Sequence, residues 1–276
     1  MFTLNCKGNL VVWDRPWVMG ILNITTDSFY EGSRFRDPER ILQKAQQMIA
    51  EGADIIDVGG QSTRPGSQRI SASEELERVV PILELLYTHT SGILLSVDTY
   101  HSSVARAAVK AGASLVNDIS AGAMDPEMLY TVGSLSVPYI CMHMKGVPET
   151  MHHQSHYEDI VTEILDFFAS RLEDCKAAGI HDVIVDPGFG FGKNPAHNFH
   201  LLKHLSLFKQ LERPLMVGLS RKSLVYKTLG ISPEESLNGT TFLHTIALLQ
   251  GAMLLRVHDV LAAREAITLY TSYIKA

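Results

Sequence analysis

Short apolar runs that end abruptly in polar residues recur along the chain and alternate with amphipathic stretches. After the first run, which ends at Asn23, the side chains of Ile41, Ala45 and Met48 share one face at helical spacing. Runs of the same kind lie at 18–22, 55–56, 93–97, 115–116, 138–142, 183–185, 215–217 and 253–255. Apolar strands that alternate with amphipathic helices are typical of a parallel sheet covered by helices.

Eight strand-and-helix units in 276 residues predict an α/β fold with a single (β/α)8 TIM barrel, because this barrel commonly takes about 250 residues. A doubly wound open sheet is the competing architecture. Weak alternation of apolar and polar residues over 2–13 predicts a short N-terminal β-hairpin before the barrel. No linker or shift in composition divides the sequence, so we expect one domain over 1–276.

Composition and charge narrow the class of protein. A hydrophobic content of 46% suffices for a sizeable core, and a net charge of −6 argues against a nucleic-acid partner. No apolar run reaches the roughly 18 residues of a membrane span, and the first residues do not resemble a signal peptide. The sequence has three cysteines, Cys6, Cys141 and Cys175, which are widely spaced and form no zinc or disulfide pattern. We therefore expect a cytoplasmic protein.

Polar side chains follow nearly every predicted strand. In a barrel the C-terminal ends of all the strands meet at one face, where active sites are built, so their recurrence predicts a functional site there. The strand ends and the loop after the second strand supply Asn23, Asp57, Thr63, Arg64, Asp98, Asn117, His143, Asp186, Lys222, Arg256 and His258.

Some of these residues suit a multiply charged anion. Arg64, Arg256 and His258 are candidates for binding a diphosphate, since a guanidinium presents a planar fork of donors. Asn23 can add an oxygen ligand to Mg²⁺, which usually keeps several waters and shares the phosphates of a substrate. This part of the set therefore indicates a phosphorylated substrate and a magnesium ion.

Other strand ends offer hydrogen-bond acceptors. Asp98 and Asp186 are acceptors, and the amide of Asn117 can accept and donate. Together they suit a ligand rich in N–H groups, such as an amino-substituted heterocycle. We expect Asp57 to be the most purely structural member of the whole set.

The glycine-rich segment at 188–193 is not a phosphate-binding loop. A Walker A loop has four residues between its first glycine and Gly-Lys, followed by Ser or Thr, whereas here three residues intervene and Asn194 follows. We interpret Phe189 and Phe191 instead as candidate walls for an aromatic substrate.

Sequence blocks at the strand ends form an ordered set. They are Met19-Gly20-Ile21-Leu22-Asn23-Ile24-Thr25 with Asp27-Ser28-Phe29, Ser62-Thr63-Arg64-Pro65-Gly66, Ser96-Val97-Asp98-Thr99, Asn117-Asp118, Asp186-Pro187-Gly188-Phe189-Gly190-Phe191-Gly192, Ser220-Arg221-Lys222-Ser223 and Arg256-Val257-His258-Asp259. In this order, over about 18–262, they resemble the signatures of the dihydropteroate synthase family of pterin-binding barrels. Three residues depart from the pattern: Thr26 stands where the family often has proline, Gln61 where it often has glutamate, and Ser33 where it often has glycine.

The resemblance implies a (β/α)8 barrel that joins two small molecules, 4-aminobenzoate and 6-hydroxymethyl-7,8-dihydropterin diphosphate. The products are 7,8-dihydropteroate and diphosphate, in folate biosynthesis. It also implies Mg²⁺ as cofactor and a homodimer. Because diphosphate leaves readily once its charge is neutralised, we expect an SN1-like loss of diphosphate before the arylamine attacks.

The resemblance also assigns roles to residues. The pterin-holding set is Asp98, Asn117, Asp186 and Lys222. The diphosphate and magnesium set is Arg256, His258 and Asn23, with Arg256 also packed beside the pterin ring. The residues near 4-aminobenzoate are Thr63, Arg64, Pro65 and Ser223, with Phe29 and Phe191 as apolar walls. The residues expected to carry the chemistry are Lys222, Arg256, His258 and Arg64.

Two other functions share part of this pattern. A pterin-dependent corrinoid methyltransferase on a related barrel would need a cobalamin partner, and it has less use for the anion-binding set of Arg64, Arg256 and His258. A non-catalytic pterin-binding barrel is the second alternative. The presence of Asn23 and Lys222, together with His258, argues against it.

Overall fold

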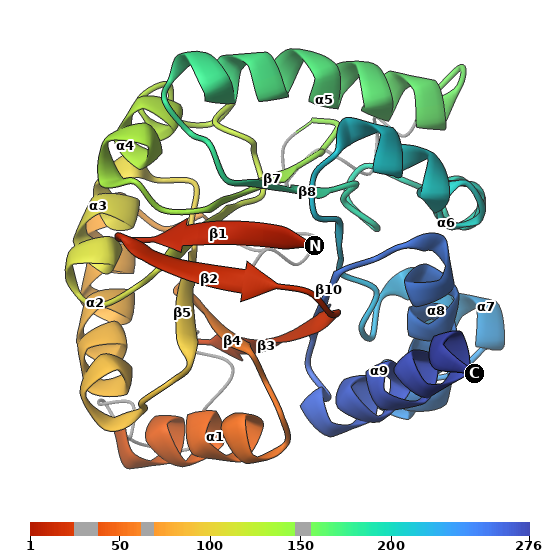
Figure 1. Cartoon of the computed structure of the whole chain (residues 1–276), viewed down its shortest axis with the longest axis horizontal. Coiled ribbons are helices and arrows are strands. Elements are labelled where there is room, and N and C mark those ends of the chain that lie inside the picture. The colour runs from red at the N-terminus through yellow and green to blue at the C-terminus, as the bar shows by residue number, and fades with distance from the viewer. Residues whose placement is uncertain (25–37, 62–68, 147–155) are drawn as a thin grey trace.

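The computed structural model describes residues 1–24, 38–61, 69–146 and 156–276. Within these residues, eight parallel strands form the central sheet (Figure 1). They are β3 (Trp17–Asn23), β4 (Ile55–Gly59), β5 (Leu94–Asp98), β6 (Leu115–Asp118), β7 (Tyr139–Met142), β8 (Val183–Asp186), β9 (Met216–Val217) and β10 (Leu254–Val257).

The sheet closes on itself. The strands are hydrogen-bonded in the order β8-β7-β6-β5-β4-β3-β10-β9. A parallel bridge between Val185 and Leu215 joins the two ends, where the N–H of Val185 donates to the carbonyl of Pro214 at 3.0 Å. This closure confirms the predicted (β/α)8 barrel and is incompatible with an open doubly wound sheet.

Helices surround the barrel and bury their apolar faces against it (Figure 1). They are α1 (Pro38–Ala50), α2 (Ala72–His89), α3 (Ser102–Lys110), α4 (Met128–Leu135), α5 (Ile160–Ala177), α6 (Pro195–Lys203), α7 (Ser223–Leu229), α8 (Leu237–Gln250) and α9 (Val260–Lys275), with 3₁₀ turns η3 (Leu205–Leu211) and η4 (Glu234–Ser236). In α1, the buried residues are the predicted stripe of Ile41, Ala45 and Met48. None of the helices described combines the length and the apolar character that crossing a membrane requires.

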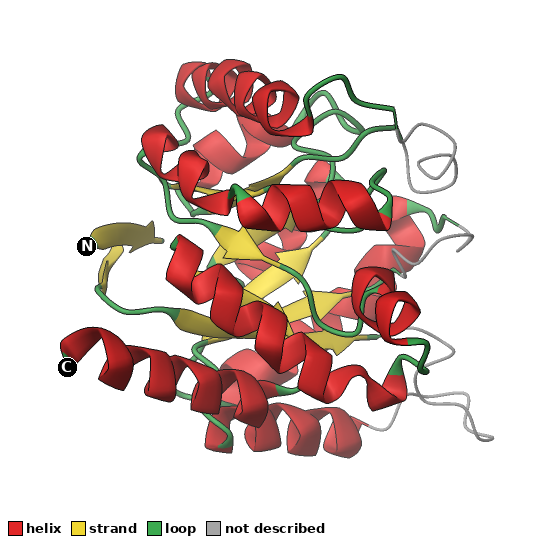
Figure 2. Ribbon diagram, turned by 90° about the vertical axis from the view of Figure 1, so that its right-hand side faces the viewer, coloured by secondary structure: helices red, strands yellow, loops and turns green. Residues whose placement is uncertain are grey.

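A two-stranded antiparallel hairpin lies at one end of the barrel strands (Figure 2). It comprises β1 (Phe2–Cys6) and β2 (Asn9–Trp13), and it confirms the hairpin predicted from the sequence. Trp13 is fully buried and stacks on Trp17 with ring centroids 4.7 Å apart. The hairpin packs on the first apolar layer inside the barrel, formed by Met19, Ile55, Leu115, Ile140, Ile184, Met216 and Leu254.

The inward-facing positions change from apolar to polar along the strands. On β4, Ile55 belongs to the apolar layer under the hairpin, whereas Asp57, two residues further on, hydrogen-bonds to Arg256 of β10. Residues two apart on a strand face the same side. The same change separates Leu115 from Asn117, Ile184 from Asp186 and Leu254 from Arg256. The apolar plug thus leaves a polar layer towards the C-terminal ends of the strands, where the predicted site residues lie.

Candidate active site

Arg256 bridges two buried carboxylates at the centre of the polar layer. Its Nε donates to Asp57 Oδ2 at 2.7 Å, and its Nη2 donates to Asp98 Oδ2 at 2.6 Å. Asn117 Nδ2 also donates to Asp57 Oδ2, at 2.9 Å. The structure therefore brings together three of the predicted site residues, and it places Asp57, which we expected to be structural, in direct contact with two of them.

The buried carboxylates are held in conditions that disfavour their charge. Burial raises the pKa of Asp98 to about 7, with a further contribution from Asp57, against the opposing pull of Arg256. Burial also raises the pKa of Asp186, against the opposing charge of Lys222. A ligand that presents N–H donors to these oxygens would relieve this cost, because hydrogen bonds to a carboxylate favour its ionised form.

The polar layer also has acceptor capacity that the described residues do not use. Asp57 Oδ1 and Ser96 Oγ are buried and have no hydrogen-bond partner within the described part of the chain. These two residues lie opposite each other on β4 and β5. Buried polar atoms are normally paired, so their presence here is consistent with a site that receives a polar ligand or ordered water.

Lys222 lies between β9 and α7, immediately before the helix. Its Nζ donates to the carbonyl of Phe189 and lies 4.7 Å from the centre of the Phe191 ring. Burial lowers the pKa of Lys222 to about 8, although the nearby carboxylate of Asp186 opposes this shift. The predicted pterin-binding cation is thus held between a backbone carbonyl and an aromatic face.

An apolar wall adjoins these charged groups. Phe191 is partly buried and packs against a small cluster of Tyr100, Ile119 and Met142. This cluster is separate from the main core, and its three residues are buried, so the partly buried Phe191 ring is held against an apolar support. The position suits the predicted role of Phe191 beside an aromatic substrate.

His258 is oriented by a serine from the neighbouring loop. The backbone N–H of His258 donates to Ser220 Oγ at 3.2 Å, and Ser220 Oγ lies 3.1 Å from His258 Nδ1. The guanidinium of Arg221 donates twice to the carboxylate of Asp259, which follows β10, at 2.9 and 2.6 Å. These contacts join the loop that carries Lys222 to the end of β10.

Asn23 lies at the end of β3, close to Asp98. A Cβ atom built on the intervening Gly59 would lie 3.3 Å from Asn23 Oδ1 and 3.6 Å from Asp98 Cβ. Within the described residues, the Asn23 side chain makes no hydrogen bond, and no group of three or more His, Cys, Asp or Glu side chains could hold a metal ion. One unpaired amide oxygen fits Mg²⁺ that takes most of its ligands from phosphate and water.

The comparisons with known proteins agree along nearly the whole chain. Residues 19–258 match the sequence model of the family described as "Pterin binding enzyme". The dihydropteroate synthase of Escherichia coli K12 is 40% identical over 275 residues, which cover 99% of this chain and 97% of that protein. This chain belongs to the dihydropteroate synthase family.

Solved dihydropteroate synthases have the same fold as this chain. The Yersinia pestis dihydropteroate synthase, solved as a sulfonamide drug complex, matches with a TM-score of 0.93 and 43% identity, covering 100% of both chains. The Xanthomonas albilineans dihydropteroate synthase, solved with 4-aminobenzoic acid, matches with a TM-score of 0.92 and 41% identity, covering 99% of this chain and 98% of that one.

Several residues that the dihydropteroate synthase resemblance singled out lie outside the described residues. They are Thr63, Arg64, Pro65 and Phe29, together with the departures Thr26 and Ser33. The third departure, Gln61, is described and buried. Its Nε2 donates to the hydroxyl of Tyr100 at 2.6 Å, and its Oε1 accepts from the N–H of Ile70 at 2.9 Å. Gln61 thus joins the residues that follow β4 to those that follow β5.

Sequence reasoning gave no role to two residues that contact the site. Ser220 orients His258, and its signal is its place two residues before Lys222. Lys193 is buried beside the glycine-rich segment, with its Nζ 2.9 Å from the carbonyl of Gly188. Its signal is a lysine that ends a glycine-rich segment without completing a phosphate-binding motif.

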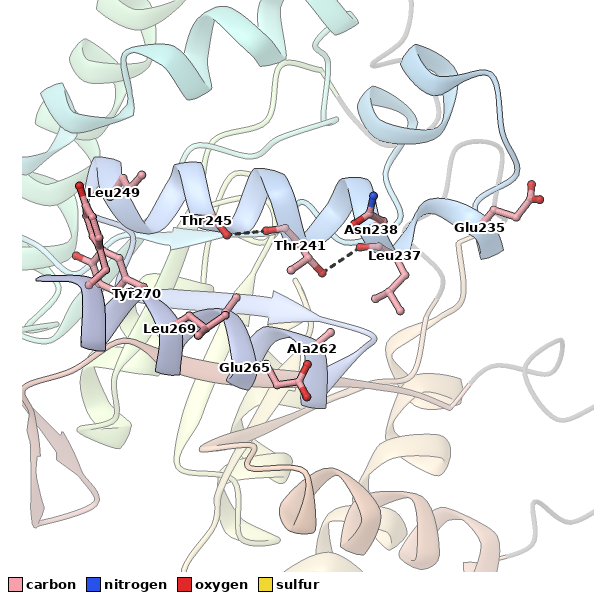
Figure 3. Close-up of a pocket in the computed structure, with 12 residues that line it drawn as sticks. Glu235, Leu237, Asn238, Thr241, Thr245, Leu249, Ala262, Glu265, Leu269 and Tyr270 are labelled. Atoms are coloured by element: carbon pink, nitrogen blue, oxygen red, sulfur yellow. Dashed lines mark hydrogen bonds between the residues drawn. The ribbon is translucent and has the colours of Figure 1, made fainter.

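An apolar groove of about 770 Å³ lies on the outside of the barrel between α8 and α9 (Figure 3). Leu249 and Leu269 line it, together with Tyr273, and these side chains are 52%, 72% and 72% exposed. No predicted site residue lines this groove. The groove is therefore a surface feature separate from the polar layer.

Proposed function

We propose that this protein condenses 6-hydroxymethyl-7,8-dihydropterin diphosphate with 4-aminobenzoate, which gives 7,8-dihydropteroate and diphosphate in folate biosynthesis. Membership of the dihydropteroate synthase family over nearly the whole chain supports this reaction. The Xanthomonas albilineans relative was solved with 4-aminobenzoic acid and also with 7,8-dihydropteroate. The observation that carries the proposal is the buried layer of acceptors bridged by Arg256.

The polar layer has the chemistry that a pterin ring requires. Asp98, Asn117 and Asp186 supply acceptors for the N–H groups of the ring, and Lys222 supplies a donor for its oxygen or nitrogen acceptors. The pKa of Asp98, raised to about 7 by burial, would fall when ring N–H groups donate to its carboxylate. Phe191 provides an apolar face beside these groups.

The diphosphate would lie among the cations at the mouth of the barrel. Arg256 and His258 would donate to its oxygens, together with Arg64. Because Ser220 Oγ accepts from the backbone N–H of His258, its hydroxyl proton can be donated to Nδ1, which leaves the Nε2 of the ring as the donor towards an anion. Asn23 would hold a magnesium ion. When bound, this ion would neutralise negative charge on the diphosphate.

No nucleophilic side chain is needed for the condensation. When the C–O bond to diphosphate breaks, the electron pair leaves with the diphosphate, and the positive charge that remains on the exocyclic carbon is delocalised into the pterin. The amino group of 4-aminobenzoate then forms the new C–N bond and loses a proton. The buried carboxylates of Asp57 and Asp98 favour the developing positive charge, since opposite charges attract strongly in a low-dielectric site.

Product analysis tests this function against its alternatives. Purified protein with Mg²⁺ and both substrates should yield 7,8-dihydropteroate, identified by mass spectrometry. A non-catalytic pterin-binding barrel would bind the pterin without forming product. A corrinoid methyltransferase would instead transfer a methyl group from a methylated pterin to a cobalamin protein, so methyl transfer without dihydropteroate formation would overturn the proposal.

The apolar groove between α8 and α9 supports a homodimer. Exposed apolar side chains gather there and on the adjoining surface of α9, among them Leu269 and Tyr273, each 72% exposed, and Ile274, 55% exposed. Contiguous exposed apolar patches are uncommon on monomers and mark interaction sites. We propose that this surface contacts a second copy of the chain, since closed symmetric dimers are the commonest oligomers.

We also propose a cytoplasmic location. The three cysteines are free and buried: Cys6, Cys141 and Cys175. Burial raises the pKa of Cys6 to about 11, which keeps that thiol protonated and unreactive. Free thiols of this kind suit a reducing compartment.

A further inference from the structure

Lys193 is a buried lysine whose amino group has several acceptors around it. Its Nζ lies 3.0 Å from His143 Nδ1, 2.9 Å from the carbonyl of Gly188, 3.0 Å from the carbonyl of Phe191 and 3.4 Å from the carbonyl of His143. Burial lowers the pKa of His143 to about 2, so its ring is neutral, and in the tautomer that carries its proton on Nε2 the Nδ1 atom accepts from the lysine. These acceptors belong to only two segments, the residue after β7 and the glycine-rich segment after β8.

The two segments are packed backbone against backbone. Gly188 has a φ of 70°, and a Cβ atom built on it would lie 1.9 Å from the carbonyl oxygen of His143, so glycine is required there. The N–H of Phe191 donates to the carbonyl of Gly188 at 3.1 Å, which folds the segment into a turn. Lys193 donates to the carbonyls on both sides of this contact.

The same turn carries groups of the proposed pterin site. Its Phe189 carbonyl accepts from Lys222, and its Phe191 ring lies 4.7 Å from that lysine's Nζ. The N–H of Gly188 donates to Asp186 Oδ1 at 2.8 Å. A displacement of the turn would therefore move the partners of both Lys222 and Asp186.

We infer that Lys193 is a positioning residue of the pterin site, which ties the turn at 188–191 to the end of β7 and thereby fixes Lys222 and Phe191. The inference rests on the proposed function and gives Lys193 no contact with substrate. Removal of its amino group would take this donor from three carbonyls and a ring nitrogen, and of these the Gly188 carbonyl would keep the N–H of Phe191. Because unpaired buried acceptors are costly, the turn would shift towards water and misplace the site.

A lysine that only stabilises the fold would behave differently. It would lower the melting temperature and the fraction of active protein, but the protein that remains folded would bind pterin normally. A positioning residue changes the affinity of the folded protein. The decisive readouts are therefore the KM and the Kd of pterin diphosphate, each corrected for the active fraction by binding stoichiometry.

The main test compares Lys193→Met with Lys145→Met. Lys145 is a nearby lysine whose Nζ contacts Glu163 at 3.1 Å and lies over the Tyr157 ring, so its substitution is a matched control outside the turn. We expect Lys193→Met to raise the KM and Kd of pterin diphosphate about tenfold, and Lys145→Met to change them by less than about twofold. Unchanged KM and Kd in folded Lys193→Met would overturn the inference.

A second variant keeps the test decisive if Lys193→Met does not fold. His143→Phe removes the Nδ1 acceptor and retains an aromatic ring, and it should raise the pterin Kd in the same direction by a smaller factor. Where both variants fold, the effect of His143→Phe should largely disappear in the Lys193→Met background, because the two residues act through one contact. Additive effects would contradict the inference. A wild-type protein without turnover would instead refute the proposed function, and the Kd measurements need no turnover.

Discussion

Arg256 and Asp57, which are 199 positions apart in the sequence, share a hydrogen bond of 2.7 Å from Nε to Oδ2 inside the barrel. Asp57 is fully buried, whereas the Arg256 side chain is 19% exposed. The same Asp57 oxygen accepts from Asn117. A carboxylate below the mouth of the barrel thus sets the direction of the cation that we assign to the pterin and the diphosphate.

Asp57→Asn should lower turnover through this relationship. The amide keeps the shape of the side chain but removes the charge that holds Arg256, so we expect kcat/KM to fall about 100-fold, or about 2.7 kcal/mol. Asp174→Asn is the control for the loss of a carboxylate charge, because Asp174 on α5 is 51% exposed and pairs with Arg171 at 3.2 Å, outside the polar layer. Steady-state kinetics on both variants measure this effect. Wild-type kcat/KM in Asp57→Asn would contradict the role of Asp57 in holding Arg256.

The pKa of Asp98 predicts how pterin binding depends on pH. Burial raises this pKa to about 7, so the carboxylate gains a proton as the pH falls below 7 and then accepts hydrogen bonds poorly. We expect the Kd of the pterin to rise up to about tenfold for each pH unit below 7. Asp98→Asn should weaken binding at pH 8 and remove the pH dependence. Calorimetric titration from pH 5 to pH 8 measures the Kd of the pterin for the wild type and the variant. If the Kd of Asp98→Asn depended on pH as steeply as that of the wild type, this would contradict the role of Asp98.

Glu75 predicts a pH effect on stability. Burial raises its pKa from 4.5 to about 7, so the folded state retains a proton that the unfolded state releases. The contribution of Glu75 to the free energy of unfolding is therefore fully present below about pH 4.5, and it is lost as the pH rises towards 7. Glu75→Gln, which can still accept from Thr99, should increase the free energy of unfolding at pH 8 by up to about 3 kcal/mol, with little change at pH 4.5.

Urea denaturation at the two pH values measures this difference. The exposed Glu77 on the same helix provides the control substitution, Glu77→Gln, which should leave the free energy of unfolding within about 0.5 kcal/mol of wild type. A Glu75→Gln variant that gained no stability at pH 8 relative to pH 4.5 would show that burial does not hold this carboxyl in its neutral form.

Asn23→Ala tests the proposed magnesium ligand. The amide makes no hydrogen bond within the described residues, so its loss should leave the melting temperature almost unchanged. Loss of one oxygen ligand should raise the Mg²⁺ concentration for half-maximal rate about tenfold. Activity measured over a series of Mg²⁺ concentrations gives this value. The same Mg²⁺ dependence in the variant and the wild type would rule out Asn23 as a ligand.

Tyr273→Glu tests the proposed homodimer surface. A carboxylate in the apolar groove would be desolvated on association, so we expect the variant to be monomeric where the wild type is dimeric. Tyr130→Glu on α4 is the matched control, because Tyr130 is 70% exposed and Tyr273 is 72% exposed. Light scattering after size-exclusion chromatography gives the masses. A dimeric Tyr273→Glu variant would place the interface elsewhere.

Much of the fold follows from local sequence patterns. Alternating strands and helices predict the barrel because each apolar run needs an amphipathic cover. Alternation over 2–13 predicts the hairpin but not its position under the barrel, since the stacking of Trp13 on Trp17 depends on tertiary packing. The closing bridge between Val185 and Leu215 likewise joins two segments that no local pattern relates.

The sequence predicts the site as a set of residues but not as a set of contacts. A barrel brings strand ends together, so Asp98, Asn117 and Arg256 could be expected on one face. Which carboxylate pairs with Arg256 depends on the depth and direction of each side chain, which periodicity does not give. The pattern alone therefore suggests a structural role for Asp57, although Asp57 contacts two predicted site residues.

Release of diphosphate is the measurement that tests the central claim most directly. Purified protein is incubated with Mg²⁺ and 6-hydroxymethyl-7,8-dihydropterin diphosphate, and free diphosphate is followed with a coupled assay. We expect addition of 4-aminobenzoate to start release that matches dihydropteroate formation mole for mole. Tight binding of the pterin diphosphate without release on addition of 4-aminobenzoate would contradict the account.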